Sequence, residues 1–389
     1  MMGRSAYING TSITPMNRRD RTIEDMAHQV VAEALLDAGV AADAVDLVIF
    51  SNATAGRLLD QGCIRGQSFL QKAGLRHAGI INVDNSCAGG SSALHLASLA
   101  ALGGSGTVLA VGVEKMWTGD RAATLAGIED GVPLADRIRM HQELENPSGS
   151  VLMGLNATWT IDQMRERGAT PEQFAAVVVK SRRHAAHNPD AQYQSEVTID
   201  DVLNSAPITG PLTRLMCSSF TDGAAAAVIS ATPRSGAPRI RASVVRSGNG
   251  DLDYHDRLAE TGAAAWEQAG LGPDEIDLIE LHDATSAEEL YALESLGFFA
   301  PGDAGPATMA GKTAAGGGGV AVNTSGGLVG RGHPLGATGI AQVVEVTRQL
   351  HGQAGGRQVP EARIGVAANT GGMIWGDAAF IGIHVIESS

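Results

Sequence analysis

The sequence is poor in aromatic residues and has no excess of positive charge. Aromatic side chains make up 4% of the 389 residues, whereas glycine occurs 50 times, a composition that favours tight turns and close backbone packing over a core of large rings. The formal net charge of −14 argues against a nucleic-acid-binding protein, because such a protein needs a basic face. No run of lysine or arginine suggests a membrane anchor either.

Cysteine is also scarce, with Cys63, Cys87 and Cys217 as its only occurrences. An odd number of widely spaced cysteines does not fit a disulfide framework, so we expect a reducing compartment and a cytoplasmic protein. The N-terminal run MMGRSAYING lacks the apolar core of a signal peptide. Residues 88–113 contain no Asp, Glu, Lys or Arg, but serines, a histidine and a glycine-rich break interrupt them. We therefore expect a buried helix, a turn and a buried strand there, and no membrane insertion.

Motifs for dinucleotide, phosphate or metal binding are incomplete. The run GRGHPLG at 330–336 spaces its last two glycines one residue too far apart for a dinucleotide-binding loop. Residues 311–313 (GKT) end like a phosphate-binding loop, but Pro306 stands where that loop needs glycine. His184 and His187 lack the cysteines or carboxylates that would complete a zinc site, so a solvated helix end is expected there, and no metal.

What the sequence does contain is an alternation of helical and strand-like stretches. Residues 23–38 carry apolar side chains at helical spacing, and residues 44–50 form a continuous apolar run, as in a strand covered on both faces. Helices that alternate with buried strands indicate a layered α/β architecture.

This pattern occurs twice. Residues 38–54 and 269–285 lie 231 positions apart and share seven identical residues. Each copy is followed by a glycine-rich junction, which carries Cys87 in the first and His333 in the second, and then by a helix and a strand. We therefore predict two related halves, and a pseudo-twofold axis between them would bring the two junctions together.

The domain boundaries follow from the same comparison. We expect an N-terminal half at 1–236 and a C-terminal half at 237–389, divided near an Ala-Pro pair. Residues of about 117–205 are richer in charge and in Met, Arg, His and Gln, so we interpret them as a region inserted over the catalytic face.

Cys87 is a candidate nucleophile. It lies in residues 82–96 (NVDNSCAGGSSALHL), where a turn after an apolar run leads into a helix, and a helix N-terminus favours a thiolate over a thiol. The alternative is a small cysteine packed beneath the helix. His333, in NTSGGLVGRGHPLGATG at 323–339, lies at a similar junction, and such a pair suggests a nucleophile with its base.

Several motifs, taken in order, resemble those of the thiolase superfamily, nearest to the sterol-carrier-protein type of thiolase and its thiolase-like relatives. The motifs are NSCAGGSSAL, GVEKM (112–116), HDATSAEEL (282–290), NTSGGLVGRGHPLGATG and AANTGG (367–372). The resemblance covers nearly the whole chain. It implies an α/β, thiolase-like duplicated α-β-α-β-α layered fold, with two five-layered halves and an inserted loop domain in the first. It also implies a homodimer or homotetramer that acts on coenzyme A thioesters and holds no permanently bound cofactor.

The resemblance also implies roles for individual residues. Cys87 would be acylated, and the backbone N–H groups of Cys87 and Gly371 would form one oxyanion hole. His333 would activate Cys87 and, with a water held by His282, stabilise the second oxyanion. Alternatives are a histidine satisfied in the core for His282 and a helix-capping imidazole for His333. Possible substrate contacts are Ser325, Asn369 and His141.

One departure from the family pattern affects the predicted reaction. Degradative thiolases need a second cysteine as an acid–base group, but the two positions that supply it hold Ala284 and Asn369 here. Acyl transfer through Cys87 does not need that group. We therefore favour an acyl-CoA-dependent acyltransferase or condensing enzyme of lipid metabolism.

Other functions stay open at this stage. One is a degradative 3-ketoacyl-CoA thiolase in which His141 or Tyr193 replaces the missing cysteine. Another is a retro-aldol carbon–carbon lyase that acts with a small OB-fold partner protein, although such a lyase would not need Cys87. A catalytically silent scaffold subunit fits least, because Cys87, His282 and His333 are all present.

Overall fold

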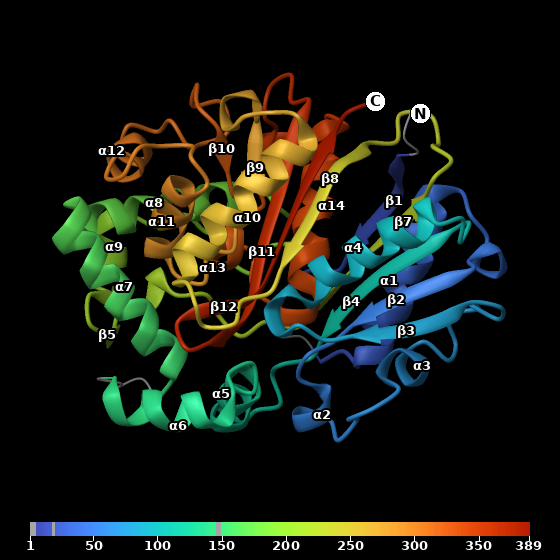
Figure 1. Ribbon diagram of the computed structural model, residues 1–389, viewed down its shortest axis with the longest axis horizontal. Coiled ribbons are helices and arrows are strands. Elements are labelled where there is room, and N and C mark those ends of the chain that lie inside the picture. Colours follow the sequence, from blue (N-terminus) through green and yellow to red (C-terminus); the bar gives the residue numbers. More distant parts are fainter. Residues whose placement is uncertain (1–4, 18–19, 145–148) are drawn as a thin grey trace.

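The computed structural model describes residues 5–17, 20–144 and 149–389 (Figure 1). The first four residues of the predicted N-terminal half and residues 145–148 of the predicted inserted region lie outside the described residues. No helix within the described ranges has the length and apolar character needed to cross a membrane.

Most strands join one ten-stranded sheet. Its first half and the helices around it are β1 (Ala6–Ile13), α1 (Ile23–Ala38), β2 (Leu47–Ser51), α2 (Ala55–Leu58), α3 (Arg65–Phe69), β3 (Gly79–Val83), α4 (Gly89–Leu102), β4 (Val108–Glu114) and β7 (Gly223–Ser230). Between β4 and β7 lie α5 (Arg121–Glu129), α6 (Leu134–Glu143), α7 (Val151–Arg167), α8 (Pro171–Ala186), α9 (Ile199–Leu203), β5 (Pro207–Thr209) and β6 (Leu212–Thr213).

The second half of the sheet follows in the same way. Its elements are β8 (Arg239–Arg246), α10 (Tyr254–Ala269), β9 (Leu278–Glu280), α11 (Ser286–Ser295), α12 (Ala304–Met309), β10 (Ala321–Val322), α13 (Gly327–Gly330), α14 (Thr338–Leu350), β11 (Ile364–Ile374) and β12 (Asp377–Glu387).

The sheet repeats its strand order on either side of its centre. From the centre outward the first half runs β1-β7-β4-β2-β3, and the second half runs β8-β12-β11-β9-β10. In each half the outer three strands are parallel and the inner pairings are antiparallel. The two halves meet where β1 pairs with β8. The predicted duplication is confirmed in this topology.

The repeated residues have repeated structural roles. Gly39 and Gly270 end α1 and α10 in the left-handed conformation, with φ of 67° and 63°, which suits glycine because it has no Cβ. The Asp46 carboxylate accepts from the backbone N–H of Thr107, just before β4. Asp277 accepts in the same way from the residues that begin β11. In both halves, therefore, the repeated residues end a helix and fix the start of a neighbouring strand.

Helices cover both outer faces and fill the space between the two half-sheets. Val30 of α1 packs in one apolar cluster with strands of the first half, and Leu258 of α10 packs in another with strands of the second. Leu94 of α4 and Ile340 of α14 lie in a third cluster that contains strand residues from both halves. The predicted α-β-α-β-α layering is confirmed, but its five layers run through the two halves together and share the central helices.

The boundaries of individual elements follow their pairing partners. The helix predicted at 23–38 is α1. The strand predicted at 44–50 begins only at Leu47, because Ala42–Ala44 form a 3₁₀ turn. The strand predicted after the second junction and its helix is β11, which runs as far as Ile374 because it continues in an antiparallel hairpin with β12.

Candidate active site

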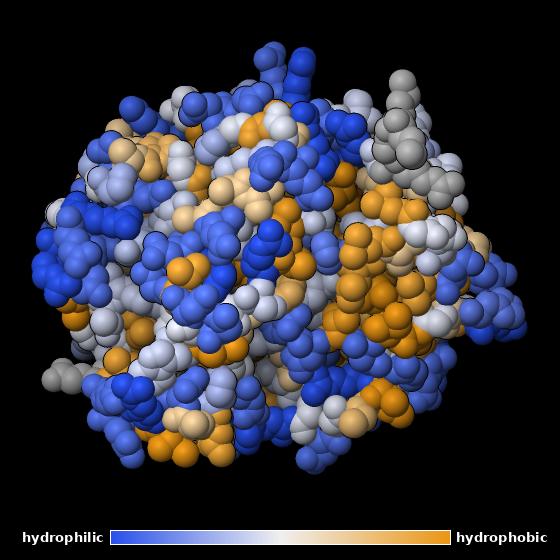
Figure 2. Space-filling model, viewed as in Figure 1, coloured by the Kyte–Doolittle hydropathy of each residue, from blue (hydrophilic) through white to orange (hydrophobic). Residues whose placement is uncertain are grey.

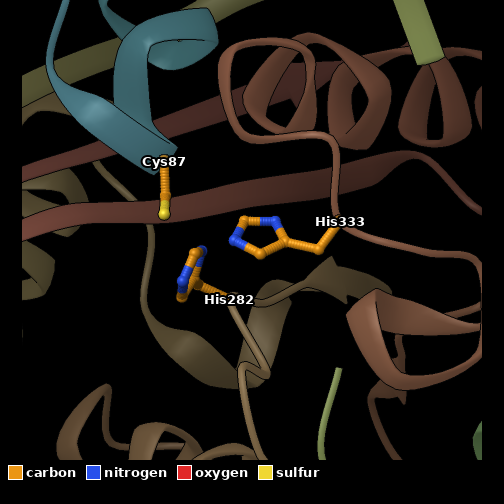
Figure 3. Close-up of side chains that lie close together, drawn as sticks. All are labelled: Cys87, His282 and His333. Carbon is orange, nitrogen blue, oxygen red and sulfur yellow. The ribbon is translucent and has the colours of Figure 1, made fainter. Parts of the chain in front are cut away.

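Cys87, His282 and His333 meet at the junction of the two halves (Figure 3). One sulfur or ring nitrogen from each residue lies within 4.8 Å of the others. Cys87 comes from the 3₁₀ turn before α4, His282 from the loop after β9, and His333 from the loop before α14. The two imidazole rings stand nearly perpendicular, with their centroids 5.0 Å apart. Cys87 and His333 therefore lie close together, as the duplication predicts.

The backbone around Cys87 is held in a strained turn. Ser86 has a φ of 51°, in the left-handed region that side chains other than glycine rarely adopt. The Asp84 carboxylate accepts from its backbone N–H at 3.1 Å, and the Asn85 amide donates to the Ser92 hydroxyl at 2.8 Å. These contacts fix the turn from both sides, so that the Cys87 side chain points towards the two histidines (Figure 3).

The protonation state of Cys87 differs from the sequence prediction. Cys87 does lie at the N-terminal end of α4, which was expected to favour a thiolate. However, burial raises the pKa of its thiol to about 12, and the nearby Glu114 carboxylate acts in the same direction. The resting nucleophile is therefore a neutral thiol, and its attack on a substrate requires a base within reach.

The hydrogen bonds of His333 determine which ring nitrogen is the base. The Thr338 hydroxyl donates to the Pro334 carbonyl at 2.9 Å and lies 2.8 Å from His333 Nδ1. Because that hydroxyl has only one proton, it must accept from Nδ1–H, which leaves Nε2 with a free lone pair. Burial lowers the pKa of His333 well below its usual value, so the ring is neutral and able to accept a proton.

His282 has the complementary tautomer. The Asn369 amide nitrogen lies 2.9 Å from His282 Nδ1, and an amide nitrogen can only donate, so Nδ1 accepts and the proton resides on Nε2. Burial lowers the pKa of His282 to about 3. The site therefore presents one imidazole as a proton acceptor and the other as a hydrogen-bond donor.

Buried carboxylates join the loops that carry these groups. Glu114, at the end of β4, accepts from the Thr54 hydroxyl at 2.6 Å and from the backbone N–H of Gly336 at 2.9 Å. Glu280, at the end of β9, accepts from the Ser325 hydroxyl at 2.5 Å. The loop before α14 is thus fixed to both halves of the sheet, and the position of His333 depends on both carboxylates.

The three residues open onto a cavity of about 590 Å³. The predicted inserted region forms much of its wall, with Leu125 and Ile128 of α5, Met153 and Trp159 of α7 and the side chain of Tyr193. Arginines at 121, 182 and 214 also lie on this wall. The cavity therefore combines an apolar interior with positive charge, a combination that suits an acyl chain attached to an anionic carrier.

The other predicted contacts occupy different places. Gly371 lies on the cavity wall, and a Cβ there would come within 2.3 Å of the Ala88 backbone nitrogen, so its backbone presses against the Cys87 turn. Asn369 and Ser325 are buried behind the wall. His141 is an exposed residue of α6 that contacts Glu129 at 3.3 Å, and it is not part of the wall.

The prediction from the sequence missed several residues that line the cavity. Cys217 lines the cavity beside Ala284, because the next backbone N–H, that of Ser218, donates to the Ala284 carbonyl at 2.9 Å. The cavity is also lined by Tyr254, Glu288 and Thr370. Cys217 lies in neither of the two motifs that supply the second cysteine of degradative thiolases, so only its place in the cavity brings it into consideration.

The prediction of a solvated helix end at His184 and His187 holds for His187, the exposed residue that follows α8, but not for His184. His184 is not at a solvated helix end: it is 4% exposed and contacts the Asn323 carbonyl at 3.0 Å and the Ala315 backbone N–H at 3.1 Å. Burial lowers its pKa to about 4. It joins α8 to two loops of the second half, which is a structural role.

The high pKa of Cys87 predicts how its alkylation depends on pH. Because the neutral thiol is the stable form up to a pKa of about 12, the thiolate fraction should rise roughly tenfold per pH unit from pH 7 to pH 10. Iodoacetamide labelling, followed by peptide mass spectrometry, should show this slope for Cys87, with the exposed Cys63 as an internal comparison. A labelling rate that is already constant below pH 8 would contradict it.

Two protein-family models match this chain. Residues 6–232 match the thiolase N-terminal domain, and residues 246–382 match the thiolase C-terminal domain-like family. The predicted boundary at 236 and 237 falls between the two matches and remains a prediction.

Known proteins agree with these matches. An acetyl-CoA acetyltransferase of Methanothermobacter thermautotrophicus is 38% identical, over 91% of this chain and 92% of its own. The benzoylsuccinyl-CoA thiolase subunit BbsB of Thauera aromatica is 32% identical, over 95% of each chain. Human sterol carrier protein 2 is also 32% identical, over 95% of this chain and 70% of its own.

Solved structures show the same fold. The Ltp2-ChsH2(DUF35) aldolase superposes with a TM-score of 0.81 at 23% identity, over 100% of this chain and 98% of that one. Human mitochondrial 3-ketoacyl-CoA thiolase superposes with a TM-score of 0.72 at 16% identity, over 99% of each chain.

Proposed function

Because this chain belongs to the thiolase family and is an acyltransferase of that family, we propose that it transfers acyl groups from coenzyme A thioesters through an S-acyl intermediate on Cys87. The observation that carries the proposal is a neutral thiol clustered with two neutral imidazoles of opposite tautomer. This set can deprotonate a nucleophile and stabilise an oxyanion without any further group.

In the first half-reaction, His333 acts as the base. Its Nε2 accepts the thiol proton as the Cys87 sulfur attacks the thioester carbonyl carbon. The backbone N–H groups of Cys87 and Gly371 stabilise the resulting oxyanion, a role supported by the close approach of the two backbones. The carbon–sulfur bond to coenzyme A then breaks, and the leaving thiolate takes the proton from His333.

In the second half-reaction, His282 stabilises negative charge on the acceptor. Its Nε2–H donates to the acceptor's carbonyl oxygen or to a water bound there, and Asn369 holds the ring in this tautomer. An amide cannot exchange a proton in the way that a thiol does. Asn369 therefore supports acyl transfer or condensation over the cycle of a degradative thiolase.

One observation favours that degradative thiolase as a second candidate. Cys217 lies on the wall of the same cavity, beside Ala284, and so could replace the missing second cysteine. Thiolysis of acetoacetyl-CoA by free coenzyme A, abolished in Cys217→Ser, would support this reading.

A retro-aldol lyase receives less support. The aldolase that shares the fold is named as a complex with a DUF35 partner, and a small OB-fold partner stays a proposal for this chain as well. Retro-aldol cleavage needs no acyl-enzyme, and Cys87 with its base would then be unused. Cleavage of a β-hydroxyacyl-CoA without any covalent modification would favour the lyase.

The decisive experiment for acyl transfer is the intact mass of the protein after incubation with acetyl-CoA and longer acyl-CoAs. We expect one acyl increment in the wild type and none in Cys87→Ala. A protein that stays unmodified with every acyl-CoA would refute the proposal. We also propose that the protein is cytoplasmic. The experiment is therefore done in a reducing buffer, which keeps cysteine thiols reduced as the cytoplasm does.

The structure also suggests where copies of the chain associate. β3 pairs only with β2 within the described residues, and Ile81 on this edge strand is 48% exposed. Leu96 and Leu99 of the adjoining α4 are 38% and 52% exposed, and Figure 2 shows an apolar patch over this side of the molecule. An exposed strand edge beside an apolar surface is suited to pairing with a second copy. We propose this face as the interface of a homodimer or homotetramer.

A single charge on this face should therefore dissociate the oligomer. We expect Leu99→Glu to sediment as a monomer at concentrations where the wild type is associated, because the carboxylate would be buried unpaired in the interface. Leu36→Glu on α1, where the leucine is 81% exposed, is the matched control and should sediment as the wild type does. Equal sedimentation of all three proteins would contradict the interface.

A further inference from the structure

Among the described residues that line the cavity, Glu288 is the only carboxylate. It belongs to the first turn of α11, which begins two residues after Ala284, and both residues line the cavity. Its side chain is 3% exposed, and within the described residues its Oε1 atom has no hydrogen-bond partner. An unpartnered carboxylate oxygen is costly to bury, so this atom calls for an explanation beyond packing.

The other contacts of Glu288 leave Oε1 available. Its Oε2 lies 3.4 Å from His255 Nε2, and His255 itself is 5% exposed, with its ring packed against Trp159 and Tyr291. No lysine or arginine of the described residues pairs with Glu288.

Tyr254 lies on the cavity wall that Glu288 and Cys87 share. Its hydroxyl lies 3.0 Å from that of Thr370, and both residues line the cavity. Burial raises the pKa of Tyr254 well above its usual value, and the charges of Glu288 and Cys87 act in the same direction. Glu288, Tyr254 and Cys87 all line the same cavity, so the Glu288 carboxylate faces the space into which the acyl-enzyme opens.

We propose that Glu288 is the acid–base group of the second half-reaction, and that its free Oε1 removes a proton from the α-carbon of an acyl-CoA acceptor. The inference rests on the proposed acyl transfer. The other candidates are already engaged: His333 serves Cys87, and Asn369 cannot exchange a proton. The Cys217 thiol donates to the Thr213 carbonyl at 3.5 Å. Burial raises the pKa of that thiol to about 12, so it stays protonated near pH 7 and lacks the thiolate that would remove an α-proton.

The step balances without an oxidant or a further reactant. Oε1 takes the α-proton, and the electrons of the carbon–hydrogen bond form an enolate whose oxygen accepts from His282 Nε2–H. The α-carbon attacks the carbonyl carbon of S-acyl Cys87, so that a carbon–carbon bond forms and the carbon–sulfur bond breaks. Cys87 leaves as a thiolate and regains a proton, while Glu288 releases the one it took. The product is a 3-ketoacyl-CoA.

The test is exchange of the α-protons of acetyl-CoA in D₂O, followed by mass spectrometry of the recovered thioester. We expect the wild type to introduce deuterium and Glu288→Gln to do so at least about 100-fold more slowly. Acylation of Cys87 by the same thioester should proceed at the wild-type rate in this variant. Glu267→Gln, which changes an exposed carboxylate of α10 away from the cavity lining, is the matched control and should exchange as the wild type does. Cys217→Ala is measured in parallel as the test of the second candidate.

Several outcomes would overturn the inference: no exchange by the wild type, wild-type exchange in Glu288→Gln, or exchange lost in Cys217→Ala alone. If Glu288→Gln does not fold, as judged by its melting transition, Glu288→Asp replaces it and should lose at least about 10-fold in exchange with normal acylation. Full exchange in that variant would also overturn it. Failure of the proposed acyl transfer looks different, since Cys87 would stay unmodified whatever residue stands at 288.

Discussion

Replacing His333 with asparagine should slow acylation of Cys87 by about 10²–10⁴-fold, the range usual for the loss of a general base. The reason is the protonation state of the resting site. Burial keeps the Cys87 thiol neutral, with a pKa of about 12, so almost no thiolate forms near pH 7 without transfer to His333 Nε2. Quenched-flow mass spectrometry of the acyl increment measures this rate directly.

A second variant separates the base from the hydrogen bond that orients it. Thr338→Val removes the oxygen that accepts from His333 Nδ1–H, so the ring can adopt the wrong tautomer but keeps its basic nitrogen. We expect acylation to slow in this variant by less than in His333→Asn. Wild-type acylation in His333→Asn would show that another group deprotonates Cys87. If acylation slowed as much in Thr338→Val as in His333→Asn, the base would depend entirely on the hydrogen bond that fixes its tautomer.

Replacing Asn369 with aspartate should inactivate the second half-reaction while leaving acylation intact. A carboxylate only accepts, so at 2.9 Å from His282 Nδ1 it would draw the ring proton to that nitrogen and remove it from Nε2. His282 would then present a lone pair where the enolate or oxyanion needs a donor. Loss of one such donor typically costs about 10²–10³ in rate. Burst kinetics should show full acylation of Cys87 followed by slow release of product.

The direction in which the pKa of His282 changes provides a further test of its role as a donor. The introduced carboxylate also raises the pKa of His282 from about 3, because an adjacent negative charge stabilises the imidazolium. Any residual activity should therefore increase as the pH falls and the ring regains a proton on Nε2. Asn369→Leu, which removes the donor without adding charge, should lose activity without this recovery. Normal turnover in Asn369→Asp would mean that His282 Nε2–H is not the donor that stabilises the acceptor.

Much of the fold could be predicted from the sequence because it depends on local periodicity and on a repeated pattern. The apolar spacing of residues 23–38 fixes α1 in any context that buries one face, and Thr22 caps its first turn. The two copies at 38–54 and 269–285 share residues that end a helix and fix the start of a neighbouring strand. Two such copies predicted both the symmetric sheet and the meeting of Cys87 with His333.

By itself, then, the sequence determined the layered fold, its duplication and the residues at the two junctions, because those depend on contacts that are near in the chain or repeated along it. Only the tertiary structure decided the state of the site. The neutral Cys87 thiol follows from burial, and the tautomer of His282 follows from Asn369, 87 residues away. The cavity positions of Cys217 and Glu288 follow from loops packed together across the sheet. Desolvation and hydrogen bonding depend on which groups share a space, and residue order does not contain that information.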